Sequence, residues 1–379
     1  MKTKISLGFM IVLMMFPQFV ETIYSPALPN LADAFKVSDT KALLTISIYF
    51  IAFAIGVIFW GILSDYIGRR KAMIYGLSTY AIASIVALIS PKFEILLLAR
   101  FISAFGIAVG SVITQTMMRD IYSGKELGKV FSIMGVALSI SPVIGLLLGG
   151  GTVRYFGYYG VFILLAFLAL ILVTVAIQKL PETKQDDTKI TVKSTIALSK
   201  KMYTDKTIII FALLVMCFNV LLFSYYSFAP FIFKKAGLSS TIYGYSGIIL
   251  AIGSFVGSFI NKKCIEKNIS PYSMIITAAV LAFLNATLLY FLNDSLLFLV
   301  PTLLIVASFG IAIPNILSQS LLSYKTSIGS AGALFGLLYY LLIGSGLFIS
   351  SKMDNLGNVV VVFSFLSLVL AITIKRINK

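Results

Sequence analysis

Two charged residues lie well inside apolar runs of the chain, and together they suggest proton chemistry. Glu21 falls in the first apolar run and Arg100 in the fourth. A charge in hydrocarbon is costly, so such residues are functional candidates by default. A carboxylate can take up and release a proton, and a nearby guanidinium favours its charged form. We therefore expect that moving Glu21 and Arg100 apart would couple protonation to a conformational change.

The spacing of these residues within their runs predicts that both charges lie at one depth. Glu21 precedes the predicted helix end at Leu28 by the same number of residues as separates Arg100 from the helix start at Phe93. At about 1.5 Å per residue, each charge lies roughly 10 Å below the outer boundary. Two simpler interpretations stay open, a static buried ion pair or a Glu21 side chain that reaches outward to water.

The elements that position these charges are predicted to be membrane-spanning helices. The chain has 379 residues, of which 59% are hydrophobic and 12% charged, and its mean hydropathy is +1.01. Runs of about 20 apolar residues are long enough to cross the hydrocarbon core as helices. The sequence predicts an all-α integral membrane protein with twelve such helices, at 5–28, 42–63, 72–90, 93–118, 128–151, 157–177, 207–233, 241–261, 271–291, 295–322, 328–350 and 359–374.

A polar stretch divides these spans into two bundles of six. We expect an N-terminal bundle at 1–178, a cytoplasmic linker at 179–206 and a C-terminal bundle at 207–379, which would be two parallel repeats of one unit. Gly61 and Asp65 have counterparts with the same spacing in Gly257 and Asn261, where an amide replaces the acid. The large majority of Lys and Arg residues outside the spans fall in alternate gaps. This bias predicts cytoplasmic termini on a multi-pass protein of the cell membrane.

The distribution of residue types also excludes several classes of function. The formal charge is +16, but the cations lie in short gaps between apolar runs, so we expect the lipid bilayer and not nucleic acid as a partner. The chain has no His, and Cys217 and Cys264 are isolated, so we expect no metal site and no other cofactor. No nucleophile–base constellation is visible, which argues against an enzyme. The absence of His, the many Lys and Ile residues and the short loops suggest a bacterial source.

One short loop joins the second and third predicted spans and carries a distinctive motif. It reads Gly61-x-Leu63-x-Asp65-x-x-Gly68-Arg69-Arg70-Lys71. Gly68 permits a turn, Gly61 lets another backbone approach, and Asp65 could cap the next helix or pair with an Arg. A positive-inside loop that only sets topology would also fit. The spacing resembles the loop between helices 2 and 3 of the major facilitator superfamily.

That resemblance implies a proton-driven transporter that works by alternating access. The loop would be a cytoplasmic latch formed by Gly61, Asp65, Gly68, Arg69, Arg70, Arg119 and Asp120. We expect Asp65 to pair with Arg119, or near the end of the eleventh helix, when the outer side is open. Ala99-Arg100-Phe101-Ile102 with Gly106 and Gly110 resembles the Arg-containing helix 4 of proton-driven members, which assigns proton coupling to Glu21 and Arg100.

Three further motifs point to export. The fifth span resembles the antiporter helix of drug exporters through Gly135, Ser141, Pro142, Gly145, Gly149 and Gly150. Leu180-Pro181-Glu182-Thr183 resembles the end of the N-terminal bundle in such exporters. Met118-Arg119-Asp120-Ile121-Tyr122 resembles the bicyclomycin-resistance (Bcr/CflA) branch of drug:proton antiporters. The resemblance implies multidrug-type efflux of amphiphilic small molecules. A dedicated exporter of an endogenous metabolite, such as a siderophore-like metallophore or a sugar, also fits, and an importer fits less well.

Few polar or aromatic residues within the spans are candidates for substrate contact. An apolar cavity with few polar groups suits a broad range of small molecules. Hydrogen bonds between helices explain the polar candidates about as well as ligand contact does. The candidate cavity residues are Tyr24, Gln115, Asn219, Tyr226, Asn315 and Gln319, of which Asn315 and Gln319 would share a helix face. We expect the transporter to work as a monomer.

Overall fold

The computed structural model describes residues 6–184 and 192–377, and these residues form helices joined by short turns. Contacts divide the chain into two compact units. The first contains Met1–Ile190 together with Ser239–Gly244, and the second contains Thr191–Leu238 together with Tyr245–Lys379. The predicted linker 179–206 includes this division, although its residues 185–191 lie outside the described part of the chain.

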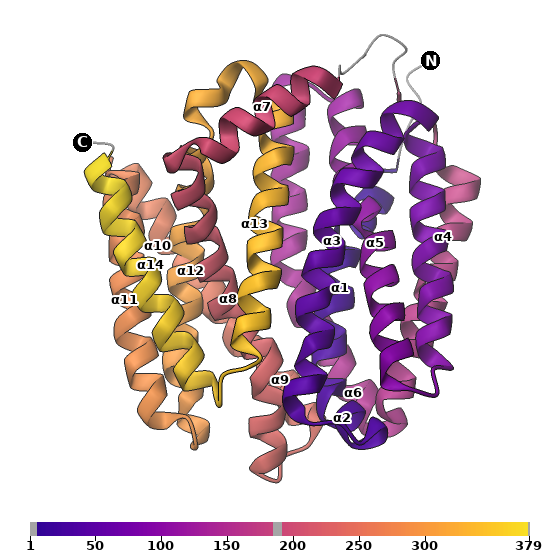
Figure 1. Ribbon diagram of the computed structural model, residues 1–379, viewed down its shortest axis with the longest axis vertical. Helices are drawn as coiled ribbons and strands as arrows, with labels where there is room; N and C mark the ends of the chain where they lie inside the picture. Colours follow the sequence, from indigo (N-terminus) through magenta and orange to yellow (C-terminus); the bar gives the residue numbers. More distant parts are fainter. Residues whose placement is uncertain (1–5, 185–191, 378–379) are drawn as a thin grey trace. The chain divides into compact units, whose positions relative to one another are not determined.

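The first unit is built from long helices that run side by side (Figure 1). Its elements are α1 (Leu7–Tyr24), η1 (Ser25–Ala27), α2 (Leu28–Phe35), α3 (Asp39–Ile67), α4 (Arg69–Leu88), α5 (Phe93–Ile121) and α6 (Gly124–Lys179). Ser38 begins α3 by accepting the backbone N–H of Lys41 at 3.2 Å. The chain then turns at Gly68, whose φ of 94° requires glycine, and α4 starts at the next residue.

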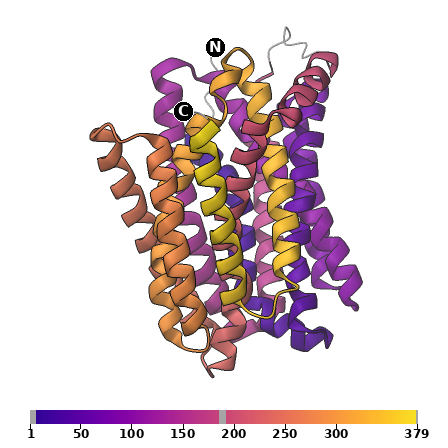
Figure 2. The same ribbon diagram turned by 60° about the vertical axis from the view of Figure 1, so that its left-hand side comes forward.

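The second unit contains the later helices, coloured from dark pink to yellow (Figure 2). They are α7 (Val192–Thr204), α8 (Lys206–Lys235), α10 (Gly247–Glu266), α11 (Pro271–Leu292), η2 (Leu296–Phe298), α12 (Leu299–Ser320), η3 (Leu322–Ser327), α13 (Ile328–Ser350) and α14 (Leu356–Ile377), whereas α9 (Ser240–Tyr245) belongs to the first unit except for Tyr245. The short α7 runs at an angle to α8 and α13 (Figure 1). α7 lies within the predicted linker 179–206, and Tyr203 helps to hold it by donating to Leu334 O at 3.1 Å.

The predicted membrane spans are confirmed, with one difference in how they are divided. Eleven helical segments in the described part of the chain are long and apolar enough to cross a membrane. The fifth and sixth predicted spans run together as the 56-residue α6, which is more than twice the length that a bilayer requires. Gly157 interrupts α6 with φ 60° and ψ −162°, so α6 supplies two spans.

Small residues bring the helices of the first unit into close contact around α5. A Cβ at Gly106 would lie 2.7 Å from Tyr80 N of α4, and one at Gly110 would lie 2.7 Å from Leu13 O of α1. A Cβ at Gly56 of α3 would overlap Phe105 O. Glycine lets helix backbones approach in this way when lipid provides no hydrophobic drive. The result is that α1, α3 and α4 all pack against the helix that carries Arg100.

Candidate functional site

Glu21 and Arg100 are both buried inside the first unit. Glu21 in α1 is 6% exposed, and Arg100 in α5 is 2% exposed. Both residues are described, and no ion pair within 4.0 Å joins them in the structure. Oε1 of Glu21 and Nε of Arg100 are each buried without a hydrogen-bond partner. The static buried ion pair, one of the two simpler interpretations left open by the sequence, is therefore not present in this structure.

Arg100 instead lies among aromatic rings. Its guanidinium carbon is 4.1 Å from the ring centroid of Tyr24 and 5.0 Å from that of Tyr49. A cation over a ring face within about 6 Å is attracted by the negative face of the π-system. We call Tyr24 and Tyr49 the aromatic cage of Arg100. Tyr49 was not among the residues predicted from the sequence, because a lone tyrosine in an apolar run gives no signal of a long-range partner.

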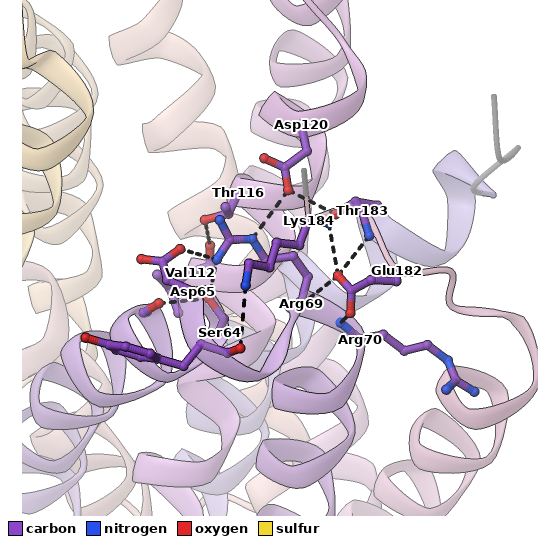
Figure 3. Close-up of polar contacts among 12 residues, drawn as sticks. Ser64, Asp65, Arg69, Arg70, Val112, Thr116, Asp120, Glu182, Thr183 and Lys184 are labelled. Atoms are coloured by element: carbon purple, nitrogen blue, oxygen red, sulfur yellow. Dashed lines mark hydrogen bonds and ion pairs between the residues drawn. The ribbon is translucent and has the colours of Figure 1, made fainter. Parts of the chain in front are cut away.

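The motif loop at 61–71 is a network of charged side chains in the first unit (Figure 3). Arg69 donates from Nη1 to Asp65 and, at 2.7 Å, to Ser64 Oγ. Its Nε donates to Asp120 Oδ2 at 3.4 Å. Thr183 Oγ1 donates to the same Asp120 oxygen at 3.0 Å. Arg69 is only 6% exposed, so this network is a partly buried core of charge and not a solvated loop.

The structure decides between the interpretations of Asp65. Asp65 forms an ion pair with Arg69, four residues further along the chain. Pairing with an Arg was one of the two roles expected for Asp65, the other being a cap on the next helix. Arg119 does not pair with Asp65 in this structure, since it is exposed and lies over the Phe131 ring at 5.6 Å, and the pairing expected when the outer side is open stays a prediction. Arg70 ties the loop to the end of α6 by donating to Leu180 O at 2.8 Å.

Glu182 is the residue that holds this network to the start of α4 (Figure 3). Its Oε1 accepts the backbone N–H groups of Arg69, Thr183 and Lys184 at 2.8, 2.9 and 3.0 Å, and its Oε2 accepts that of Arg70 at 3.1 Å. The first N–H groups of a helix have no partner within it and attract a negative charge. Burial raises the pKa of Glu182, but these four backbone N–H donors outweigh it and lower the pKa below its usual range. The sequence marked Glu182 only as part of a motif.

The glycines of the motif loop differ in what they do. A Cβ at Gly68 would overlap the Glu182 carboxylate, so this position needs glycine for space as well as for its φ. Gly61 was expected to allow a close backbone approach, but a Cβ there would meet only Val112 Cγ2 at an ordinary 3.5 Å. Its counterpart Gly257 does allow a close backbone approach in the second unit, because a Cβ there would overlap Ala307 O of α12.

The predicted antiporter helix, now the first part of α6, packs tightly against α1. A Cβ at Gly145 would overlap Thr22 Oγ1, and one at Gly149 would overlap Ile23 O. Ser141 donates to Met15 O at 3.1 Å, in the helix interrupted by Pro142. Gly135 differs, because it is exposed and a Cβ there would meet nothing within 4 Å. Close packing on α1 therefore explains Gly145 and Gly149 but not Gly135.

Gly150 of α6 contacts a segment that follows α8 in the chain. Residues 239–244 belong to the first unit, where Ser240 Oγ donates to Gly150 O at 3.0 Å. A Cβ at Gly150 would lie 2.5 Å from Ser240 O. Tyr243 OH and Ser25 Oγ, in the same unit, share a hydrogen bond of 2.6 Å. Nothing in the sequence predicted this assignment of 239–244 to the first unit.

The candidate cavity residues fall into two groups. Tyr24, Tyr226 and Asn315 are buried, whereas Gln115, Asn219 and Gln319 are half-buried. Asn315 donates from Nδ2 to Asn261 Oδ1 at 2.7 Å, so for this residue the structure supports the hydrogen bond between helices α12 and α10. Asn315 and Gln319 both lie in α12, four residues apart, and so share a helix face as expected, with Gln319 the more exposed of the two. For the other residues of this set, substrate contact stays a prediction.

Comparison with known proteins assigns the family. The profile of the Major Facilitator Superfamily matches residues 9–374. The chain belongs to the major facilitator superfamily. It is 31% identical to an uncharacterized transporter of Rickettsia bellii, over 96% of this chain and 94% of that protein. A bicyclomycin resistance protein homolog of Haemophilus influenzae is 22% identical over 91% of this chain and 88% of that protein.

Solved structures agree with the family assignment at the level of the fold. The crystal structure of a D-xylose-proton symporter superposes with a TM-score of 0.78 and 16% identity, covering 97% of this chain and 96% of that chain. At this identity the likeness shows the fold alone. The chain is therefore a multi-pass membrane transporter and not an enzyme, with bacterial relatives.

Proposed function

We propose that this transporter exports amphiphilic small molecules in exchange for protons, and that Glu21 carries the proton. The observation that carries the proposal is the burial of both Glu21 and Arg100 in the first unit, where the charge of Arg100 acts on Glu21 without an ion pair between them. An intramembrane carboxylate without a fixed partner can change its protonation state at a lower cost than one in a tight pair. Arg100 lies on a different helix, so helix movement can change its influence on Glu21.

Export is favoured over uptake by the relatives and by α6. The bicyclomycin resistance protein homolog is named for resistance to a drug, and its similarity spans almost the whole chain. Gly145 and Gly149 of α6 pack on α1, the helix that carries Glu21. This contact would let movement of the antiporter helix reach the proton site. The substrate would be neutral or cationic, since the described spans of the second unit carry no buried cation for an acidic one.

A dedicated exporter of an endogenous metabolite is the second candidate. The uncharacterized transporters of Rickettsia are more similar to this chain than the drug-resistance relative reported above, and their name gives no substrate. A siderophore-like metallophore or a sugar would fit the same proton-coupled scheme. The two candidates differ in substrate only, so a substrate screen separates them.

Everted membrane vesicles provide the screen. Respiration acidifies their interior, and an exported compound that exchanges for protons raises the interior pH, which a pH-sensitive dye reports. We expect amphiphilic drugs to give this signal and metal chelators or sugars to give none. A signal from chelators alone would replace the drug substrate by a metallophore. Uptake of a compound by intact cells along the proton gradient, with no signal in everted vesicles, would contradict export.

The proposal includes the placement of the chain in the cell membrane with its N- and C-termini in the cytoplasm. The bias of Lys and Arg toward alternate gaps supports this orientation. The motif loop and Glu182 would then lie at the cytoplasmic face. We propose a monomer as the working unit, and the light-scattering mass of the purified protein tests it.

A further inference from the structure

Arg100 and its aromatic cage form the strongest feature of the first unit that proton exchange alone does not explain. The guanidinium has ring faces of Tyr24 and Tyr49 within 4.1 and 5.0 Å of its carbon. No residue in the described part of the chain accepts a hydrogen bond from its side chain, and its Nε is fully buried. A buried guanidinium ordinarily pairs with a carboxylate. The first unit also buries the carboxylate of Glu21, on which the charge of Arg100 acts.

Both rings are fixed by their hydroxyl groups, so the cage is preorganised. Tyr24 OH donates to Thr45 Oγ1 at 3.0 Å, and Thr45 in turn donates to Ala42 O at 2.7 Å. Tyr49 OH donates to Pro17 O of α1 at 2.8 Å. Tyr24 belongs to α1 and Tyr49 to α3, whereas Arg100 belongs to α5. The position of Arg100 therefore depends on how these three helices pack.

The cage and Glu21 compete for the same cation. A buried carboxylate that pairs tightly with a guanidinium is held in its charged form and resists protonation. Stacking on ring faces stabilises a desolvated cation without any carboxylate. It also leaves the N–H edge of the guanidinium open to a transient partner. Arg100, held by the rings, therefore acts on Glu21 through its charge without forming an ion pair with it.

We propose that Tyr24 and Tyr49 are positioning residues of the proton site, which hold Arg100 off Glu21 and so set the pH at which Glu21 takes up a proton. The inference rests on the proposed role of Glu21 as the proton carrier. The other titratable group facing this cluster is Tyr80 of α4, whose hydroxyl is buried without a partner. From α6, which also packs on α1, no charged side chain of the described residues joins the cluster.

The test measures protonation of Glu21 directly. Infrared difference spectra of purified protein in lipid nanodiscs report the C=O stretch of a protonated carboxylic acid as pH is lowered. The band that is lost in Glu21→Gln belongs to Glu21. We expect Tyr49→Leu to free Arg100 for Glu21 and to move the titration midpoint toward acid by about one pH unit. Tyr49→Phe keeps the ring face, so its titration midpoint should lie close to that of wild type.

A matched control and a second variant keep the test decisive. Tyr75 of α4 is 55% exposed, and Tyr75→Leu makes the same exchange away from the cage, so its midpoint should equal that of wild type. If Tyr49→Leu does not purify as a single folded species, Arg100→Lys removes the planar stacking group and keeps the charge. In Arg100→Lys the titration midpoint of Glu21 is expected to move toward acid by the same amount as in Tyr49→Leu.

The outcomes separate this inference from the proposed function. An unchanged midpoint in Tyr49→Leu, or an equal shift in Tyr49→Phe, overturns the cage even if wild type exchanges protons for drug. An acid shift in Tyr49→Leu with recovery in Tyr49→Phe supports the cage. If wild-type vesicles then show no proton exchange with any substrate, the cage stands and the proposed function fails.

Discussion

The carboxylate of Glu182 occupies the space that a side chain at position 68 would need. Gly68 ends the turn after α3, and Glu182 follows α6, so the contact joins two ends of the first unit that are far apart in sequence. The carboxylate accepts the first two backbone N–H groups of α4. The glycine of the motif loop therefore serves an interaction with a residue outside that loop.

Substitution of this glycine should be costly. We expect Gly68→Ala to destabilise the protein by about 1–3 kcal/mol, because φ of 94° is unfavourable for alanine and the methyl group displaces Glu182. Gly61→Ala is the matched control in the same motif, and it should be neutral or stabilising by up to about 1 kcal/mol as a helix substitution. Thermal unfolding of both purified variants measures the difference. Equal losses in the two variants would contradict the assigned roles.

Glu182 also predicts a dependence of stability on pH. Its pKa is lowered in the folded state, so its contribution to stability is complete above the unfolded value of about 4.3 and is lost as pH falls through the folded value. We expect wild type to be more stable than Glu182→Gln at pH 7, with the gap closing as the pH falls below about 4. Unfolding temperatures measured from neutral pH down to about pH 3.5 check this. A gap that widens toward acid would contradict the sign.

The loss of stability on substituting a glycine of α6 should depend on how closely another helix packs against it. Gly149→Ala places a methyl group on the backbone oxygen of Ile23, which cannot rotate away, so we expect a loss of about 1–3 kcal/mol. Gly135→Ala meets open space and should change stability little. The yield of folded protein and the unfolding temperature compare the two. If Gly135→Ala is the more harmful, α6 acts through a contact that this structure does not contain.

Asn315 provides a test between packing and substrate contact. Asn315→Ala leaves Asn261 Oδ1 without its donor, and a hydrogen bond between membrane helices is worth about 1 kcal/mol. We expect Asn315→Ala and Asn261→Ala to lose similar stability, and the double variant to lose less than their sum. Substrate preference should not change. A change in substrate profile in Asn315→Ala alone, with additive stability losses, would return Asn315 to the substrate cavity.

Local patterns in the sequence predicted much of the fold. Apolar runs located the spans, Gly68 marked the turn before α4, and Asp65 was expected to pair with an Arg, which is Arg69. Each of these features depends on residues close together in the chain. The break at Gly157 was also expected as a boundary between spans, although helix continues on either side of it.

The remainder of the site depends on contacts between distant helices, which periodicity does not encode. Glu182 and Arg69 are 113 positions apart, and one carboxylate after an apolar run gives no sign of the helix start that it binds. Tyr49 looks like one more aromatic residue in an apolar helix. The sequence did predict a shared depth for Glu21 and Arg100, but not that rings would take the place of the carboxylate.

The central claim is that Glu21 carries the proton that drives transport. Purified wild type and Glu21→Gln in proteoliposomes are compared by pH-gradient-driven movement of an identified substrate. We predict that Glu21→Gln retains substrate exchange between the two sides but loses accumulation driven by the pH gradient. Full gradient-driven accumulation in Glu21→Gln would contradict the account.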